Sequence, residues 1–140
     1  MAATIHGADY VTTDIDITPD SDPGNMAHLS AALHGLDARI RTPEEPTGLA
    51  FSHEARSLAA VAVWNLVTRA GDLDISFVPS GTQGFGDLRR DAGMVTIHGV
   101  AVQVASLADV VRSKEAAGRD KDRLALPMLR RLLALGPRPR

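Results

Sequence analysis

The sequence contains no cysteine, which excludes disulfide frameworks and thiolate metal sites. It has one Trp, one Tyr and three Phe, so a core must be built mainly from Ala, Val, Leu and Ile. No apolar run approaches the roughly 18 residues that a membrane span needs. The first residues also lack the basic and apolar segments of a signal peptide. We therefore expect a cytoplasmic protein with no membrane attachment.

The 140 residues, 44% of them apolar and 23% charged, are enough for one globular domain, which we expect to span residues 1–140. The net charge of −2 hides an uneven distribution. Residues 1–111 carry 6 basic and 14 acidic side chains, whereas residues 112–140 carry 9 basic and 3 acidic ones. A basic end beside an acidic body is suited to contacting phosphates, and it is equally typical of a solvated helix face.

Hydrophobic periodicity predicts an α+β fold, with strands in hairpins and a helical C-terminal third. Alternating β-branched residues predict a strand over residues 11–17, and an Asp-Pro pair starts a helix over 24–33. Residues 52–58 are ambiguous. The remaining expected elements are a short strand at 38–41, hairpins of 61–68 with 72–78 and of 94–97 with 100–104, and helices at 84–91, from 106 to 118 and from 120.

The last helix has a less regular pattern. Pro127 should kink it or move its start later, because proline lacks an amide hydrogen and clashes with the preceding turn. We expect its apolar side to consist of Leu124, Leu126, Leu129, Leu132 and Leu133.

The clearest chemical pattern is a pair of aspartates, Asp14 and Asp16, on one face of the first expected strand. Carboxylates this close repel each other unless a counter-ion is present, and Mg²⁺ or Mn²⁺ accepts such oxygen ligands. Asp72 and Asp74 repeat the spacing on a later strand. If the two strands are neighbours, a third carboxylate joins the first two, and two metals can be held for an in-line displacement. Acidic residues on the open face of an antiparallel strand are also common without any metal.

Three segments together resemble the AbiEii/MenT-type nucleotidyltransferases of the polymerase-β superfamily. They are His6-Gly7 followed by Thr13-Asp14-Ile15-Asp16-Ile17, then residues 66–74 ending in Asp72-Leu73-Asp74, and Ser106-Leu107-x-Asp109-Val110-Val111-x-x-Lys114 followed by Gly118-Arg119-x-Lys121-Asp122. The resemblance implies a nucleotidyltransferase-like fold, with a mixed, mostly antiparallel sheet flanked by helices. It also implies metal-dependent transfer of a nucleotide from an NTP. Several members of that family are toxins that modify the 3′ end of tRNA and pair with a cognate antitoxin.

The resemblance also implies roles for individual residues. Asp14, Asp16 and Asp74 would hold the metal, Lys114 would neutralise triphosphate charge, and Asp122 would lie near the site. Thr13, Arg119 and Lys121 would contact the nucleotide, its phosphates or RNA. Read without the resemblance, Lys114 is an ordinary surface lysine.

The family carries a helix and a Gly-Gly or Gly-Ser pair before the segment that corresponds to residues 1–7, and this chain begins after that point. Three functions follow as alternatives. The first is a toxin-type nucleotidyltransferase with tRNA as acceptor. The second is a catalytically impaired member that binds a partner such as an antitoxin. The third is a small-molecule nucleotidyltransferase of the antibiotic-modifying type, whose cationic acceptor would suit the acidic body.

Overall fold

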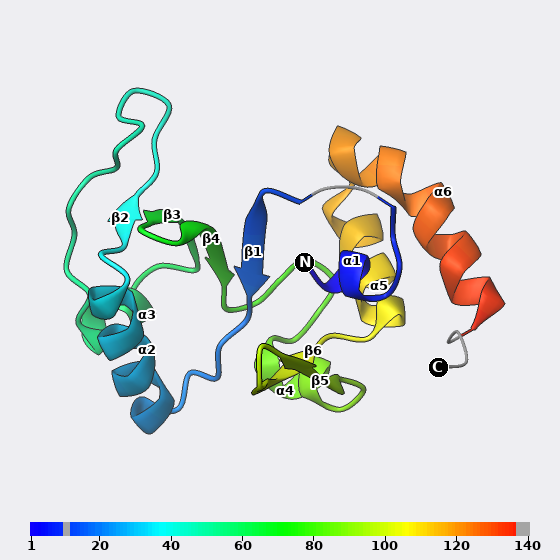
Figure 1. The fold of residues 1–140 in the computed structure, drawn as a ribbon, viewed down its shortest axis with the longest axis horizontal. Helices are drawn as coiled ribbons and strands as arrows, with labels where there is room; N and C mark the ends of the chain where they lie inside the picture. Colours follow the sequence, from blue (N-terminus) through cyan, green and yellow to red (C-terminus); the bar gives the residue numbers. More distant parts are fainter. Residues whose placement is uncertain (10–11, 137–140) are drawn as a thin grey trace. The chain divides into compact units, whose positions relative to one another are not determined.

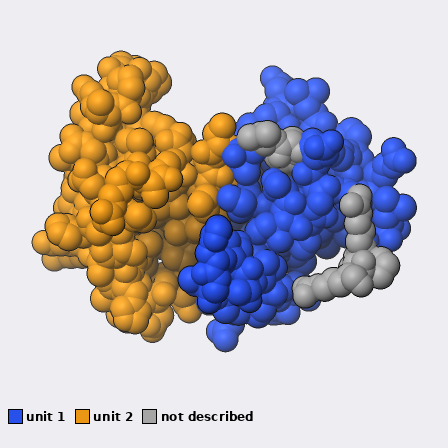
Figure 2. All heavy atoms as spheres, in the orientation of Figure 1, with its two compact units in different colours: residues 1–12, 79–140 blue, residues 13–78 orange. Residues whose placement is uncertain are grey.

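The computed structural model describes residues 1–9 and 12–136, and the chain divides into two compact units (Figure 2). Residues 13–78 form the first, called the sheet unit below, and residues 1–12 with 79–140 form the second, called the helical unit. Both helices and strands occur in each unit, and the predicted α+β class with a helical C-terminal third is confirmed (Figure 1).

The sheet unit contains a four-stranded mixed sheet with the strand order β1-β4-β3-β2. The neighbours β1 and β4 are parallel, and the other two pairs are antiparallel. The hairpin predicted from the two central segments is present, with Arg69 and Ala70 at its turn and Gly71 directly after it. Val11, predicted at the start of the first strand, lies outside the described residues. The strands are β1 (Asp14–Ile17), β2 (Arg39–Ile40), β3 (Val63–Thr68) and β4 (Gly71–Ser76).

Two helices pack on one face of this sheet, α2 (Pro23–Gly35) and α3 (Ala55–Ala59). The start of α2 is the predicted one: Asp22 caps the helix by accepting a hydrogen bond of 2.9 Å from the amide of Gly24, and Pro23 occupies the first turn. The ambiguous segment 52–58 contributes α3. The buried core of the unit comprises Met26, Leu33, Ala38, Leu58, Leu66 and Ile75.

In the part of the chain that the structure describes, the helical unit combines four helices with a two-stranded sheet. Its elements are α1 (Ala2–Ile5), α4 (Phe85–Arg89), β5 (Gly93–Ile97), β6 (Val100–Val104), α5 (Leu107–Ala117) and α6 (Asp120–Leu135). The predicted hairpin of β5 and β6 is present. Ser106 caps α5 by accepting a hydrogen bond of 3.1 Å from the amide of Asp109, and Gly118 ends it in the left-handed conformation. The buried core of the unit comprises Ala3, Ala8, Val111, Leu126 and Leu129.

Helix α6 differs from its prediction in one of its expected apolar residues. It begins at Asp120 and continues through Pro127, so the proline does not move the start. Leu124 was expected on the apolar side, and this is wrong, because its side chain is 84% exposed. The buried stripe passes through Leu126 and Leu129, and at 100° per residue Leu124 lies about 160° and 140° away from them around the helix.

Among the described helices none is both long enough and apolar enough to cross a bilayer.

Candidate metal centre

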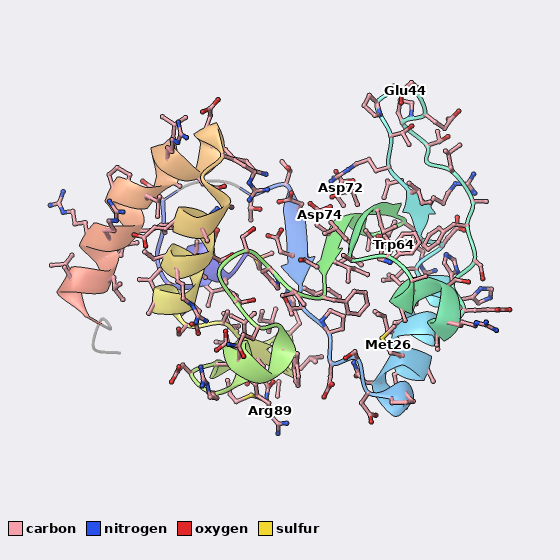
Figure 3. All side chains as sticks on the ribbon, turned by 180° about the vertical axis from the view of Figure 1, so that it is seen from behind. Met26, Glu44, Trp64, Asp72, Asp74 and Arg89 are labelled. Atoms are coloured by element: carbon pink, nitrogen blue, oxygen red, sulfur yellow. The ribbon has the colours of Figure 1, made fainter. Side chains whose placement is uncertain are left out.

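The parallel pair of β1 and β4 places four aspartates on one face of the sheet. Its register sets Asp14 opposite Asp72 and Asp16 opposite Asp74. Residues alternate between faces along a strand, and Ile75 of β4 is completely buried against the helices, so the aspartates occupy the other face. Figure 3 shows Asp72 and Asp74 together on β4, whereas Met26 belongs to the helix that covers the apolar face. Neighbouring strands lie about 4.8 Å apart, which brings the carboxylates of the two strands within reach of one ion.

Three of these carboxylates converge. Asp14, Asp16 and Asp74 each offer an oxygen atom, and the three oxygens lie within 4.8 Å of one another. Two oxygens bound to one Mg²⁺ at about 2.1 Å are at most about 4.2 Å apart, so small side-chain rotations would complete the ligand set. Carboxylate oxygens are also the hard ligands that Mg²⁺ and Mn²⁺ prefer. The donor set therefore fits a divalent cation of this kind.

The fourth carboxylate, Asp72, pairs with Arg41, which follows β2. The Nη1 atom of Arg41 donates to Asp72, and its Nη2 atom donates to Asp74 at 2.8 Å. Burial by itself would lower the pKa of Arg41, but the hydrogen bond to Asp72 and the charges of Asp74, Asp72 and Asp14 more than offset this and raise it. Arg41 is therefore a permanent positive charge among the aspartates.

Sequence reasoning missed Arg41. The sequence feature that could have pointed to Arg41 is its position at the end of the short strand expected at residues 38–41. It lies two residues after Arg39 and therefore on the same face of that strand. A strand of two residues carries too little pattern to reveal its partner, and the position of Arg41 beside β4 depends on the strand order. Thr13, predicted to contact the nucleotide, is exposed in the bend immediately before Asp14.

The remaining predicted site residues belong to the helical unit, where three of them form one ion-pair cluster. The side chain of Asp122 is fully buried and accepts hydrogen bonds from Lys114 Nζ at 3.0 Å and from Arg119 Nε at 2.7 Å. The amide of Arg119 also donates to Asp122, at 3.3 Å. The cluster joins the end of α5 to the start of α6. Lys121, the next predicted contact, is exposed on α6.

The pKa of Asp122 reflects this cluster. Burial by itself raises the pKa of the carboxyl, and the hydrogen bonds from Arg119 and Lys114 more than offset that effect, so that the pKa lies below its usual value. Asp122 is therefore ionised at neutral pH, and its negative charge is balanced by two cations. This arrangement is suited to fixing the corner between two helices.

His6, at the end of α1, has a local structural role. Its Nε2 atom donates to the carbonyl of Ala105 at 2.8 Å, which ties α1 to the segment before α5.

Comparison of the chain with protein-family models, with curated proteins and with solved structures finds no match.

Proposed function

We propose that the protein is a metal-dependent nucleotidyltransferase that moves a nucleotide from an NTP to an acceptor, with tRNA as the favoured acceptor. The observation that carries this proposal is the convergence of Asp14, Asp16 and Asp74 from two parallel strands, with oxygens within 4.8 Å of one another. Together with the resemblance of three segments to AbiEii/MenT-type enzymes, it favours phosphate chemistry over an incidental acidic surface. The cytoplasm, where NTPs and tRNA occur together, is the compartment that this function requires.

The reaction joins an acceptor hydroxyl to the α-phosphorus of the NTP. The new O–P bond forms as the bond between the α-phosphorus and its bridging oxygen breaks, the hydroxyl proton passes to water, and pyrophosphate leaves. Asp14, Asp16 and Asp74 would hold Mg²⁺ or Mn²⁺, which supplies charge neutralisation for the phosphates when bound. The chain itself holds the three carboxylates on two hydrogen-bonded strands. Because the strands already position these side chains, little conformational entropy would be lost when the cation binds.

Nucleotide transfer by the purified chain tests the proposal directly. The protein is incubated with Mg²⁺, each labelled NTP in turn and total tRNA. The double variant Asp14→Ala, Asp16→Ala should lose transfer by at least a hundredfold, since it removes two of the three ligand carboxylates. The matched control is Glu44→Ala, Glu45→Ala, which removes the same charge from a loop of the sheet unit and should keep activity. Figure 3 marks Glu44 at the tip of that loop. Absence of transfer to RNA by the unaltered chain would reject the tRNA proposal.

One observation favours a second candidate, a partner-binding protein without transfer activity. Lys114 and Arg119, expected to neutralise the triphosphate, both donate to the buried Asp122 and so already have a carboxylate partner. An antitoxin-like protein is the expected partner in this case.

A cationic small molecule is the alternative acceptor for a transferase, since the sheet unit carries 10 acidic and 4 basic side chains, a net charge of −6. Replacing tRNA by an aminoglycoside-type polyamine in the same assay distinguishes the two acceptors.

A further inference from the structure

Arg41 is held in the same row of the sheet as two of the metal-site aspartates. Its amide donates to the carbonyl of Asn65 at 2.9 Å, which extends the pairing of β2 with β3 by one residue. Asn65 lies opposite Asp74 on β4, and Asp74 lies opposite Asp16 on β1. The backbone pairing therefore fixes the position of the Arg41 Cα atom, and the two hydrogen bonds to β4 fix the position of its guanidinium group.

The guanidinium divides the four aspartates into two kinds. Asp72 and Asp74 are two residues apart on one strand, and Arg41 bridges them with separate nitrogens of its planar fork. A carboxylate has two oxygens, so Asp74 accepts from Arg41 and still offers an oxygen to the cation site. Asp72 lies directly opposite Asp14 in the register, yet it is not among the three carboxylates whose oxygens converge.

The bridge limits the oxygen ligands that this face can offer. Asp14, Asp16 and Asp74 converge on one position, whereas Asp72, which lies beside Asp14, is held by Arg41. A second Mg²⁺ or Mn²⁺ would need further oxygen ligands, and Asp72 is the carboxylate of these two strands that the first ion does not use.

We propose that Arg41 is a positioning residue of the acidic site: it orients Asp74 and withholds Asp72, so that the protein alone takes one divalent cation and no second one. The inference rests on the proposed function, because it assigns the role of Arg41 at the same site. Any second cation used in transfer then enters with the phosphates of the nucleotide.

Binding of Mn²⁺ to the full chain without nucleotide tests this inference, with free Mn²⁺ followed by electron paramagnetic resonance. The unaltered protein should bind one ion per chain. Arg41→Gln should bind two, because Asp72 becomes available. Adding Asp72→Asn to that variant should return the number to one. The matched control is Arg39→Gln, which removes the same charge two residues before Arg41. The Nε atom of Arg39 donates to the carbonyls of Thr47 and Gly48 and not to an aspartate. This variant should bind one ion.

The outcomes separate the inference from the proposed function. Two ions on the unaltered protein, or one ion on Arg41→Gln with unchanged affinity, would overturn the inference and leave the transferase proposal standing. No ion on the unaltered protein would overturn both. If Arg41→Gln does not fold, Arg41→Lys serves instead. It keeps one charge but lacks the planar fork that bridges two carboxylates, so Asp72 should become available and the variant should bind a second Mn²⁺, which the unaltered protein does not bind. An unchanged titration with this variant would contradict the inference.

Discussion

At the scale of single residues, Asp122 shows how a buried charge is stabilised. Its carboxylate has no exposed surface, and both of its cationic partners reach it from the junction of α5 with α6. The substitution Asp122→Asn removes the negative charge, so Lys114 and Arg119 lose their ion pairs with this residue. We expect this to lower the free energy of unfolding at pH 7 by about 2 kcal/mol, the usual contribution of hydrogen bonds to a charged group. Urea denaturation followed by circular dichroism measures the loss.

The same carboxylate predicts a pH dependence. Because the pKa of Asp122 is lower in the folded protein than in the unfolded chain, its stabilising contribution is present above the usual carboxyl pKa of about 4 and is lost as the pH falls through the folded value. The difference between the unaltered protein and Asp122→Asn should therefore shrink as the pH falls below about 4. The control is Asp120→Asn, whose side chain is 99% exposed and which should change stability by less than about 0.5 kcal/mol. Equal stability of Asp122→Asn and the unaltered protein at pH 7 would contradict the prediction.

At the scale of elements, two prolines in helices should have opposite effects. Pro127 lies in the interior of α6, where it removes one hydrogen bond of the helix. Pro23 lies in the first turn of α2, where its missing amide hydrogen costs nothing and its fixed backbone angle favours the helix. Pro127→Ala should therefore raise the free energy of unfolding, by up to about 3 kcal/mol, whereas Pro23→Ala should leave it unchanged or lower it by up to about 1 kcal/mol. A loss of stability in Pro127→Ala would show that α6 depends on the proline.

The elements also show what a sequence does and does not reveal. The helix starts at Asp22 and Ser106 were predictable because each is a local capping pattern, complete within four residues. The parallel pairing of β1 with β4 was not, since it joins segments about 58 residues apart and local periodicity carries no information on partners. The grouping of Asp74 with Asp14 could therefore be stated only as a condition, and Arg41 was missed altogether. The error at Leu124 has another cause: several leucines fit more than one helical stripe, and only packing decides between them.

At the scale of the whole molecule, the two units carry opposite charge. The sheet unit has a net charge of −6, and the helical unit, with 11 basic and 7 acidic side chains, has a net charge of +4. A polyanion such as tRNA should therefore bind through the helical unit, while the carboxylates of the sheet unit repel it unless cations are present. Exposed cations of α6, Lys121 and Arg131 among them, are the expected phosphate contacts. Partners with positive charge should instead favour the sheet unit.

This charge separation predicts how RNA binding responds to salt. If Lys121 and Arg131 each contact a phosphate, replacing either by Ala should weaken tRNA binding for all sequences alike and reduce the slope of log K against log salt by about 1. The matched control is Arg56→Ala, which removes an exposed arginine from α3 of the sheet unit and should leave the slope unchanged. Fluorescence anisotropy of labelled tRNA over a series of salt concentrations measures all four proteins. An equal fall in slope for Arg56→Ala would mean that binding depends on net charge alone. Unchanged slopes for Lys121→Ala and Arg131→Ala would exclude this face of α6 from the RNA contact and favour a partner other than a polyanion.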